Sequence, residues 1–306
     1  MKFGLRYASL GRYSNGAAAV ELAQAAEAAG FDSIWTVEHV VVPRGYQSRY
    51  PYSPTGRMGS GLEDYPIPDP LIWLAYVASA TRTIKLGTAI LILPQRNPVV
   101  TAKAVATLDH LAGGGRVLLG IGVGWLAEEF ATLGVPFEDR GPRTDEYVAA
   151  MRALWSQACA SYRGRFVSFD QVFCRPLPPG RRIPIIVGGD TPAAARRAGR
   201  LGDGYFPARG APTELFEEMR RAAAFVSPPT TIGMRRSTGS GRQNTSVNET
   251  YLPLKLARSW LQSARIAATY SSVRSPRSSN GTPSVANSSA SHPTPMPRST
   301  RRPPAR

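Results

Sequence analysis

Glu38 and His39 stand next to each other directly after an apolar segment, residues 31–37, that has the composition of a buried strand. In α/β barrels the carboxyl ends of the strands carry the chemistry. A histidine at such a position can exchange a proton, or hydrogen-bond a cofactor, near neutral pH. The competing interpretation is a histidine that caps the strand end and binds only backbone groups. Position alone favours neither interpretation.

The glycine-rich segment 120–124 is a second candidate site, because it follows one predicted strand and precedes a helix. Glycines there would let a ligand approach the backbone closely. Gly122, Gly124 and Ala127 also fit the loose dinucleotide pattern G-x-G-x-x-A. The acidic residue expected at the end of a following strand is missing, so a nicotinamide site of the Rossmann type is disfavoured.

A third candidate is the run Gly188-Gly189-Asp190-Thr191-Pro192, which leads from a predicted strand into a predicted helix. Free backbone N–H groups at the start of a helix suit a phosphate. Asp190 would repel an anion unless its carboxylate turns away as the helix cap. An ordinary connection into a well-capped helix explains the same residues equally well.

Several classes of protein are disfavoured by what the sequence lacks. There is no HExxH or CxxC pattern, and residues 1–224 contain only His39 and His110, so no metal site is expected. A G-x-S-x-G elbow is absent from the same residues, which disfavours nucleophilic hydrolysis. Cys159 and Cys174 are too few for a disulfide scaffold. No apolar run approaches about 20 residues and no signal peptide is recognisable, so we expect a cytoplasmic protein.

Residues 1–224 alternate between segments typical of helices and of strands. Continuous apolar strands, buried on both faces, predict a parallel sheet that helices cover. We expect about six strand–helix units, with a loop over residues 40–68 and a hairpin over 163–173. Helices are predicted over residues 16–29, 70–81, 98–111, 125–133, 145–158, 192–201 and 212–224. Strands are predicted from residue 3 and over residues 31–37, 84–93, 117–121, 183–187 and 204–206.

Residues 225–306 differ in kind from residues 1–224. They hold 12 Lys and Arg against a single Glu, with 16 Ser and 10 Pro, whereas residues 1–224 hold 25 basic against 20 acidic residues. We therefore place a boundary at residue 224 and expect a disordered tail. A shifted reading frame in a GC-rich gene would produce the same composition, and this interpretation fits the abrupt change best. A basic arm that binds nucleic acid through phosphates is the functional alternative.

Taken together and in order, the motifs of residues 1–224 resemble those of the luciferase-like monooxygenase superfamily, in its branch of actinobacterial coenzyme F420-dependent oxidoreductases. The motifs that carry the resemblance are Phe31-Asp32-Ser33-Ile34-Trp35 with Glu38-His39, Ile84-Lys85-Leu86-Gly87-Thr88, Leu93-Pro94-Gln95-Arg96-Asn97-Pro98, Leu119-Gly120-Ile121-Gly122-Val123-Gly124-Trp125, Glu128-Glu129-Phe130 and Ile186-Val187-Gly188-Gly189.

This resemblance implies a TIM-type (β/α)8 barrel with a deazaflavin across the carboxyl ends of the strands and a small-molecule substrate beside it. By analogy His39, with Glu38, supplies the proton or polarises the ring, and Ala89-Ile90 matches a non-prolyl cis peptide behind it. The other implied cofactor contacts are Gly122, Val123, Gly124 and Trp125 at the ring edge and Gly188, Gly189 and Thr191 at the phosphate. The loop over residues 40–68 would shape substrate choice.

Two implications of the resemblance remain open at the level of sequence. FMN with O2 is the alternative to coenzyme F420, and a homodimer is common in the superfamily. Nothing after residue 224 resembles the seventh and eighth strand–helix units, so the barrel is expected to be incomplete. Two unpaired sheet edges predict a marginal, aggregation-prone or inactive chain.

Overall fold

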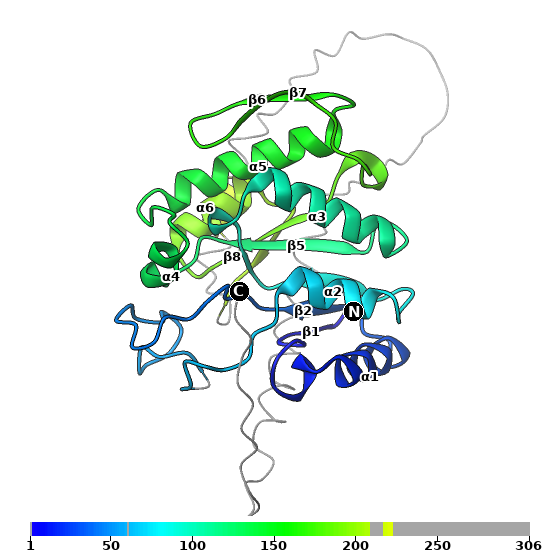
Figure 1. Cartoon of the computed structure of the whole chain (residues 1–306), viewed down its shortest axis with the longest axis vertical. Helices are drawn as coiled ribbons and strands as arrows, with labels where there is room; N and C mark the ends of the chain where they lie inside the picture. The colour runs from blue at the N-terminus through cyan, green and yellow to red at the C-terminus, as the bar shows by residue number, and fades with distance from the viewer. Residues whose placement is uncertain (1, 60, 209–216, 223–306) are drawn as a thin grey trace, which may run out of the picture.

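The computed structural model describes residues 2–59, 61–208 and 217–222 of the 306-residue chain (Figure 1). Its main sheet is parallel throughout and has the strand order β1-β2-β3-β5-β8-β9, with β4 paired to β5. The strands are β1 (Gly4–Leu5), β2 (Ser33–Thr36), β3 (Lys85–Thr88), β4 (Leu91–Ile92), β5 (Val117–Gly122), β8 (Ile185–Gly188) and β9 (Gly204–Phe206).

Helices connect successive strands and form an outer layer in which α1, α2, α3, α5 and α6 contact one another in that order. The helices are α1 (Gly16–Ala28), α2 (Pro70–Ala78), α3 (Pro98–Leu111), α4 (Ala127–Thr132), α5 (Arg140–Ser156) and α6 (Pro192–Leu201). Short 3-10 turns are η1 (Gly11–Ser14), η2 (Leu93–Gln95) and η3 (Pro179–Arg181). The hairpin β6 (Ala160–Arg163) and β7 (Ser168–Val172) packs outside α5.

Three of these helices begin in the same way, with a polar cap and a proline at the first helical position. Asp69, Asn97 and Thr191 each accept a hydrogen bond from a backbone N–H of the first turn of α2, α3 or α6. Proline fits there because its missing N–H would have no intrahelical partner. These local signals explain why the predicted starts of the three helices are confirmed.

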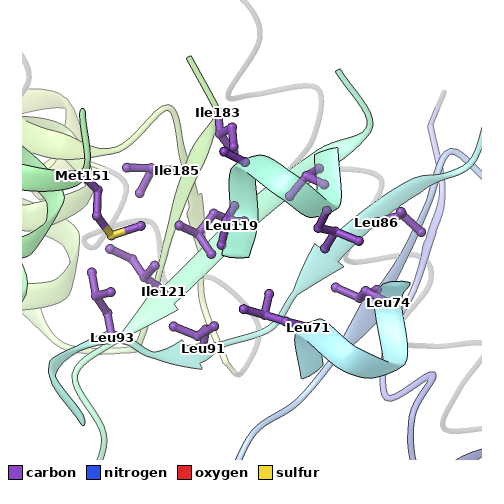
Figure 2. Close-up of a cluster of buried hydrophobic side chains, with 14 of the residues drawn as sticks. Leu71, Leu74, Leu86, Leu91, Leu93, Leu119, Ile121, Met151, Ile183 and Ile185 are labelled. Carbon is purple, nitrogen blue, oxygen red and sulfur yellow. The ribbon is translucent and has the colours of Figure 1, made fainter. Parts of the chain in front are cut away.

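The core lies between the outer face of the sheet and the helices (Figure 2). It is built from Leu71 and Leu74 of α2, Leu86 of β3, Leu119 and Ile121 of β5, Met151 of α5 and Ile185 of β8, all buried. Each fully buried leucine or isoleucine contributes about 1.5–3 kcal/mol relative to an exposed one. The core therefore holds the strands that carry the candidate site.

The sheet curls strongly, as a contact on its inner face shows. Trp35 of β2 and Phe206 of β9 have ring centroids 5.9 Å apart, although β3, β5 and β8 lie between their strands. In a flat sheet four strand spacings would separate them by about 19 Å. Gly87 of β3 makes room for the indole ring, because a Cβ there would collide with it. The sheet is thus a curled half-barrel of parallel strands with helices outside it, the arrangement of a TIM-type barrel.

Within the described residues the curled sheet has two edges, since β1 pairs with β2 and β9 pairs with β8. Arg6, just after β1, reaches the other edge: its guanidinium carbon lies 4.7 Å from the centroid of Phe206, and Nη1 donates to the carbonyl of Ala208 at 3.4 Å. The expected tail lies outside the described residues. Of the predicted helix 212–224, residues 217–222 are described and are helical.

Several predicted elements have shifted boundaries, among them the hairpin, whose strands begin at Ala160 and not at Arg163. Two further differences have a clear physical reason. The strand expected over residues 84–93 is interrupted at Ala89-Ile90, which separates β3 from β4. Helix α5 begins at Arg140 and not near Asp145. Gly141 and Pro142 look like helix breakers in the sequence, but proline is tolerated in the first turn of a helix.

In the ranges that the structure describes, no helix is both long and apolar enough to cross a membrane.

Candidate active site

His39 lies just beyond the carboxyl end of β2 and is held there by Glu129 of α4. The Nδ1 atom of His39 is 2.9 Å from Oε2 of Glu129. The side chain of Glu129 is completely buried and that of His39 is 9% exposed. A carboxylate that accepts from one imidazole nitrogen fixes the orientation of the ring and leaves the other nitrogen, Nε2, for a ligand. The pair thus has the arrangement of a positioned acid–base histidine.

The loop over residues 40–68 is fastened to the same helix by two consecutive carboxylates. Glu129 Oε1 accepts from the backbone N–H of Val40 at 2.6 Å and of Val41 at 3.3 Å. Glu128 Oε1 accepts from Gln47 N at 2.6 Å and from Ser48 N at 3.0 Å.

The hydrogen bonds between Glu128 and the loop stabilise the negative charge of its carboxylate. Burial alone would raise its pKa, but hydrogen bonds from the Ser48 hydroxyl and the loop backbone lower the pKa of Glu128 to about 2.

Aromatic side chains form a wall beside His39. The ring of Trp125 meets His39 edge-on at 5.6 Å between centroids, and it also contacts Tyr46 at 5.5 Å and Tyr50 at 5.1 Å. Tyr50 in turn contacts Tyr52 at 5.3 Å. Trp125 and Tyr50 are half-buried. A half-buried aromatic wall beside a histidine suits a planar, conjugated ligand.

Glu38, the neighbour of His39, is turned away into a buried ion pair. Its Oε1 accepts from Arg96 Nε at 2.8 Å and from Arg96 Nη2, and its Oε2 accepts from the backbone N–H of Ile92. Burial raises the pKa of Glu38, against the lowering effect of the Arg96 guanidinium. The structure therefore brings Glu38 to the strand ends but occupies both of its oxygens. Its predicted catalytic role stays a prediction.

Asp69 completes this network from the start of α2. Its Oδ2 accepts from Arg96 Nη2 at 2.6 Å, while Oδ1 caps the helix. Partial burial would raise the pKa of Asp69, but the bonds from Arg96 and from the helix backbone hold it below its usual value. Arg96 thus ties three separate segments together behind the site.

The peptide bond between Ala89 and Ile90 is cis, as the resemblance implies. The side chain of Ile90 fills the space beside two of the predicted cofactor glycines. A Cβ on Gly122 would lie 2.6 Å from Ile90 Cδ1, and a Cβ on Gly188 would collide with Ile90 Cγ2. Glycine at these two positions is explained by packing against Ile90.

Gly124 and Val123 follow the end of β5 and lead to Trp125. Gly124 has a φ of +80°, and a Cβ there would lie 2.7 Å from the ring of Phe130. Gly124 is thus required both by its backbone conformation and by packing. Val123 is half-buried at the strand end.

The end of β8 lies under the loop. A Cβ on Gly189, whose φ is +124°, would be 4.0 Å from the hydroxyl of Tyr52. Thr191 caps α6 through Ala194 N. Asp190 Oδ1 accepts from the backbone N–H of Ala208, so the carboxylate is engaged by backbone, but the expectation that Asp190 turns away as the cap of α6 is wrong.

The loop thus reaches from the end of β2 to the end of β8. Tyr50 lies near enough to Tyr7, Tyr52 and Asp190 for their charges to act on it. Burial, together with these neighbours, raises the pKa of Tyr50 to about 12. The Tyr50 hydroxyl therefore stays protonated at neutral pH and is a hydrogen-bond donor at the strand ends.

Two buried polar side chains at the strand ends have no protein partner in the described part of the chain. Ser9 follows β1 and is fully buried, and Gln95 follows β4 and is 9% exposed. Among the described residues, neither the Ser9 hydroxyl nor either amide atom of Gln95 forms a hydrogen bond. A bound molecule with polar groups would supply such partners. With the aromatic wall, this donor set fits a deazaflavin or a flavin.

No group of three or more metal-ligating side chains occurs in the ranges that the structure covers. Glu129, Arg96, Asp69 and Tyr50 are the residues at the site that sequence reasoning did not assign. Glu129 lies in a quoted motif, but acidic residues are common in the first turn of any helix. Its role becomes visible only when the fold brings residues 39 and 129 together.

Comparison with known proteins decides the family. The sequence model described as luciferase-like monooxygenase matches residues 5–278. The chain belongs to the luciferase-like monooxygenase family. The match continues past residue 224, into the part of the chain whose structure is not described.

The relatives of this luciferase-like protein include both uncharacterized and named members. The Mycobacterium tuberculosis protein Rv0940c, which is uncharacterized, is 34% identical over 215 residues, 68% of this chain and 73% of that protein. The F420-dependent glucose-6-phosphate dehydrogenase of Kineococcus radiotolerans is 34% identical over 204 residues, 65% of this chain and 54% of that enzyme.

Among solved structures, the monooxygenase RslO1 from Streptomyces bottropensis matches with a TM-score of 0.59 and 27% identity, over 74% of this chain and 67% of that one. The luciferase-like chain thus spans about half of the Kineococcus enzyme and about two thirds of RslO1. The comparisons establish an oxidoreductase family and leave the branch to be chosen.

Proposed function

We propose that this chain is an oxidoreductase that exchanges a hydride between coenzyme F420 and a small organic substrate. The observation that carries the proposal is the pairing of His39 with Glu129 beside Trp125, at the carboxyl ends of a curled parallel sheet. The motif resemblance to the F420-dependent branch supports the choice of cofactor, as does the F420-dependent relative from Kineococcus.

When bound, the deazaflavin supplies the hydride chemistry, and the protein positions and polarises the reacting groups. His39 would exchange a proton with the substrate or the cofactor at Nε2, because Glu129 engages Nδ1. Trp125 and Tyr50 would line the ring, and Ser9 and Gln95 would donate or accept hydrogen bonds at its polar edge. Thr191 and the start of α6 would face the phosphate.

The loop over residues 40–68 would exclude water and shape the substrate pocket. Its side chains Tyr50 and Tyr52 lie between Trp125 and the end of β8, and Tyr46 contacts Trp125 as well. Excluding water from this region strengthens each electrostatic interaction with the reacting atoms. Substrate choice would therefore depend on this loop more than on the strands.

An FMN-dependent monooxygenase that uses reduced flavin and O2 is the second candidate. It is favoured by the likeness to RslO1, which is named a monooxygenase. The same aromatic wall would accept an isoalloxazine ring as well as a deazaflavin. The two candidates differ in chemistry, because the deazaflavin moves a hydride without activating O2.

Thermal unfolding of the purified full chain distinguishes the candidates. Free protein, protein with F420 and protein with FMN should be compared at equal protein concentration. A ligand at 100 times its Kd adds about 2.7 kcal/mol to the free energy of unfolding. A shift with F420 alone supports the proposal. A shift with FMN alone, together with O2 consumption when reduced FMN and candidate substrates are added, would replace it by the monooxygenase.

A further inference from the structure

Three nitrogen-bearing groups form hydrogen bonds with the buried carboxylate of Glu129. Oε1 accepts from the N–H groups of Val40 and Val41, and Oε2 faces Nδ1 of His39 at 2.9 Å. No part of the Glu129 side chain is exposed, so water cannot replace any of the three. The two backbone donors fix which oxygen faces the loop, and the remaining oxygen is thereby fixed toward the histidine.

The proton on His39 is therefore decided by geometry. In neutral imidazole one nitrogen is a donor and the other an acceptor, and the partner of one nitrogen sets the state of both. When Glu129 is a carboxylate, its oxygen opposite Nδ1 requires a proton on Nδ1, and in the neutral imidazole this leaves the lone pair on Nε2. The reverse tautomer would place two acceptors against each other in a buried site.

We propose that Glu129 is a positioning residue that holds His39 in the tautomer protonated on Nδ1, so that Nε2 is the nitrogen that accepts a proton in catalysis. This inference rests on the proposed function for the catalytic step only. The same carboxylate fastens the first two residues of the loop. Glu129 thus links the tautomer of His39 to the position of the loop over residues 40–68.

Replacing Glu129 by glutamine gives a sharp expectation. The amide has one acceptor oxygen and one donor nitrogen. The two N–H groups of Val40 and Val41 retain the oxygen, so the NH2 group must face Nδ1 of His39. A donor opposite Nδ1 requires that Nδ1 is unprotonated and accepts the hydrogen bond. The E129Q substitution should therefore move the proton of His39 to Nε2. Shape is preserved while the tautomer is reversed.

Glu128 supplies the matched control. It is the adjacent residue and also anchors the loop, through the N–H groups of Gln47 and Ser48, but none of its hydrogen bonds involves His39. The E128Q substitution likewise replaces a carboxylate that binds the loop by an amide. Any effect of E129Q that acts only through a loosened loop should therefore appear in E128Q as well.

The test is NMR of the full chain labelled with 15N-histidine and free of cofactor. The chain has three histidines, and His39→Gln identifies the signals of His39. We expect a proton on Nδ1 and a bare Nε2 in the wild type and in E128Q, and the opposite in E129Q. A wild type already protonated on Nε2 would overturn the proposal even if E129Q failed to fold, and so would an unchanged tautomer in E129Q.

Kinetics with the loaded enzyme separate this inference from the proposed function. E129Q should lower kcat by about 10²-fold or more, the usual contribution of general acid–base catalysis, with little change in KM. The correct tautomer without any F420-dependent turnover would reject the proposed function and leave the positioning role intact. A reversed tautomer with unchanged kcat would reject the assignment of Nε2 as the proton acceptor.

Discussion

Arg96 and Glu38 form a buried ion pair that joins the end of β2 to the turn after β4. The side chain of Glu38 is 1% exposed and that of Arg96 is 22% exposed. The guanidinium donates through Nε and Nη2 to one oxygen of the carboxylate, Oε1, and these charge-assisted hydrogen bonds are stronger than neutral ones. Because Glu38 precedes His39, the pair also fixes the backbone from which the candidate acid–base residue projects.

Arg96→Met is expected to destabilise the protein by about 3–5 kcal/mol, because it leaves the buried Glu38 carboxylate without its charged partner. Urea unfolding at neutral pH measures this. Arg165→Met is the control: Arg165 pairs with Asp139 at the surface and is 71% exposed. That pair should contribute under about 1 kcal/mol.

Adding Glu38→Met to the Arg96→Met protein should recover much of the lost stability, since an apolar pair can replace a buried ion pair. An equal loss of stability in the double variant and in Arg96→Met would show that Arg96 stabilises the fold through Asp69 and not through Glu38.

Gly188→Ala should destabilise the protein by about 1–3 kcal/mol, because the new Cβ collides with Ile90 Cγ2. In an Ile90→Ala background the collision disappears. A double-mutant cycle by chemical denaturation should therefore give a coupling of at least about 0.5 kcal/mol between the two positions. Additive effects would mean that glycine at position 188 serves something other than the packing of Ile90.

Acid should weaken the fold through Glu27, at the end of α1. Its carboxylate accepts from the backbone N–H groups of Arg82, Thr83 and Ile84 at the entry to β3. Burial alone would raise its pKa, but these bonds lower the pKa of Glu27 from 4.5 to about 2. Because the folded state binds the proton less tightly, this stabilisation is present above pH 4.5 and is lost as pH falls toward 2.

The stability difference between wild type and Glu27→Gln should accordingly shrink as pH falls from 6 to about 2.5. Urea midpoints across that range measure it. Glu21→Gln, which removes only an exposed contact with Arg12 at 3.7 Å, should differ little from the wild type at any pH. A pH-independent effect of Glu27→Gln would point to lost hydrogen bonds and not to proton linkage.

Trp35→Ala should cost about 3–5 kcal/mol, the usual range for an aromatic side chain removed from a core. Trp35 is 2% exposed and spans the inner face toward Phe206. Calorimetry or urea unfolding gives the value. Trp125→Ala, at the half-buried site wall, should cost less and should instead weaken cofactor binding. A comparable stability loss in both variants would show that Trp125 is a core residue.

Much of the fold could be predicted because local signals are strong. Helix α3 runs over Pro98–Leu111 as the sequence predicts, since Asn97 and Pro98 define its start. The hydrophobic pattern did not predict the break between β3 and β4, because residues 84–93 form one apolar run, and only the family resemblance pointed to Ala89-Ile90. Only the packing of Ile90 beside Gly122 and Gly188 shows why the chain turns there.

The site was predicted less completely than the fold. His39 could be selected because it follows a strand, and its position at the strand ends is confirmed. Glu129 lies 90 residues further along the chain, and nothing in the spacing links the two. Arg96 and Asp69 likewise follow ordinary local patterns, a turn and a helix cap. Their shared network exists only in the curled sheet.

The carboxylates of Glu128 and Glu129 in α4 form their hydrogen bonds with the loop between residues 40 and 48 only. The residues from Arg49 to Pro68 follow these hydrogen-bonded positions and precede Asp69, the cap of α2. Tyr50 and Tyr52 still belong to the aromatic wall, but changes of length or composition after residue 52 should leave the contact between His39 and Glu129 in place. In the proposed enzyme, exchange of the loop after residue 52 is therefore a route to a different substrate choice that leaves the acid–base pair in place.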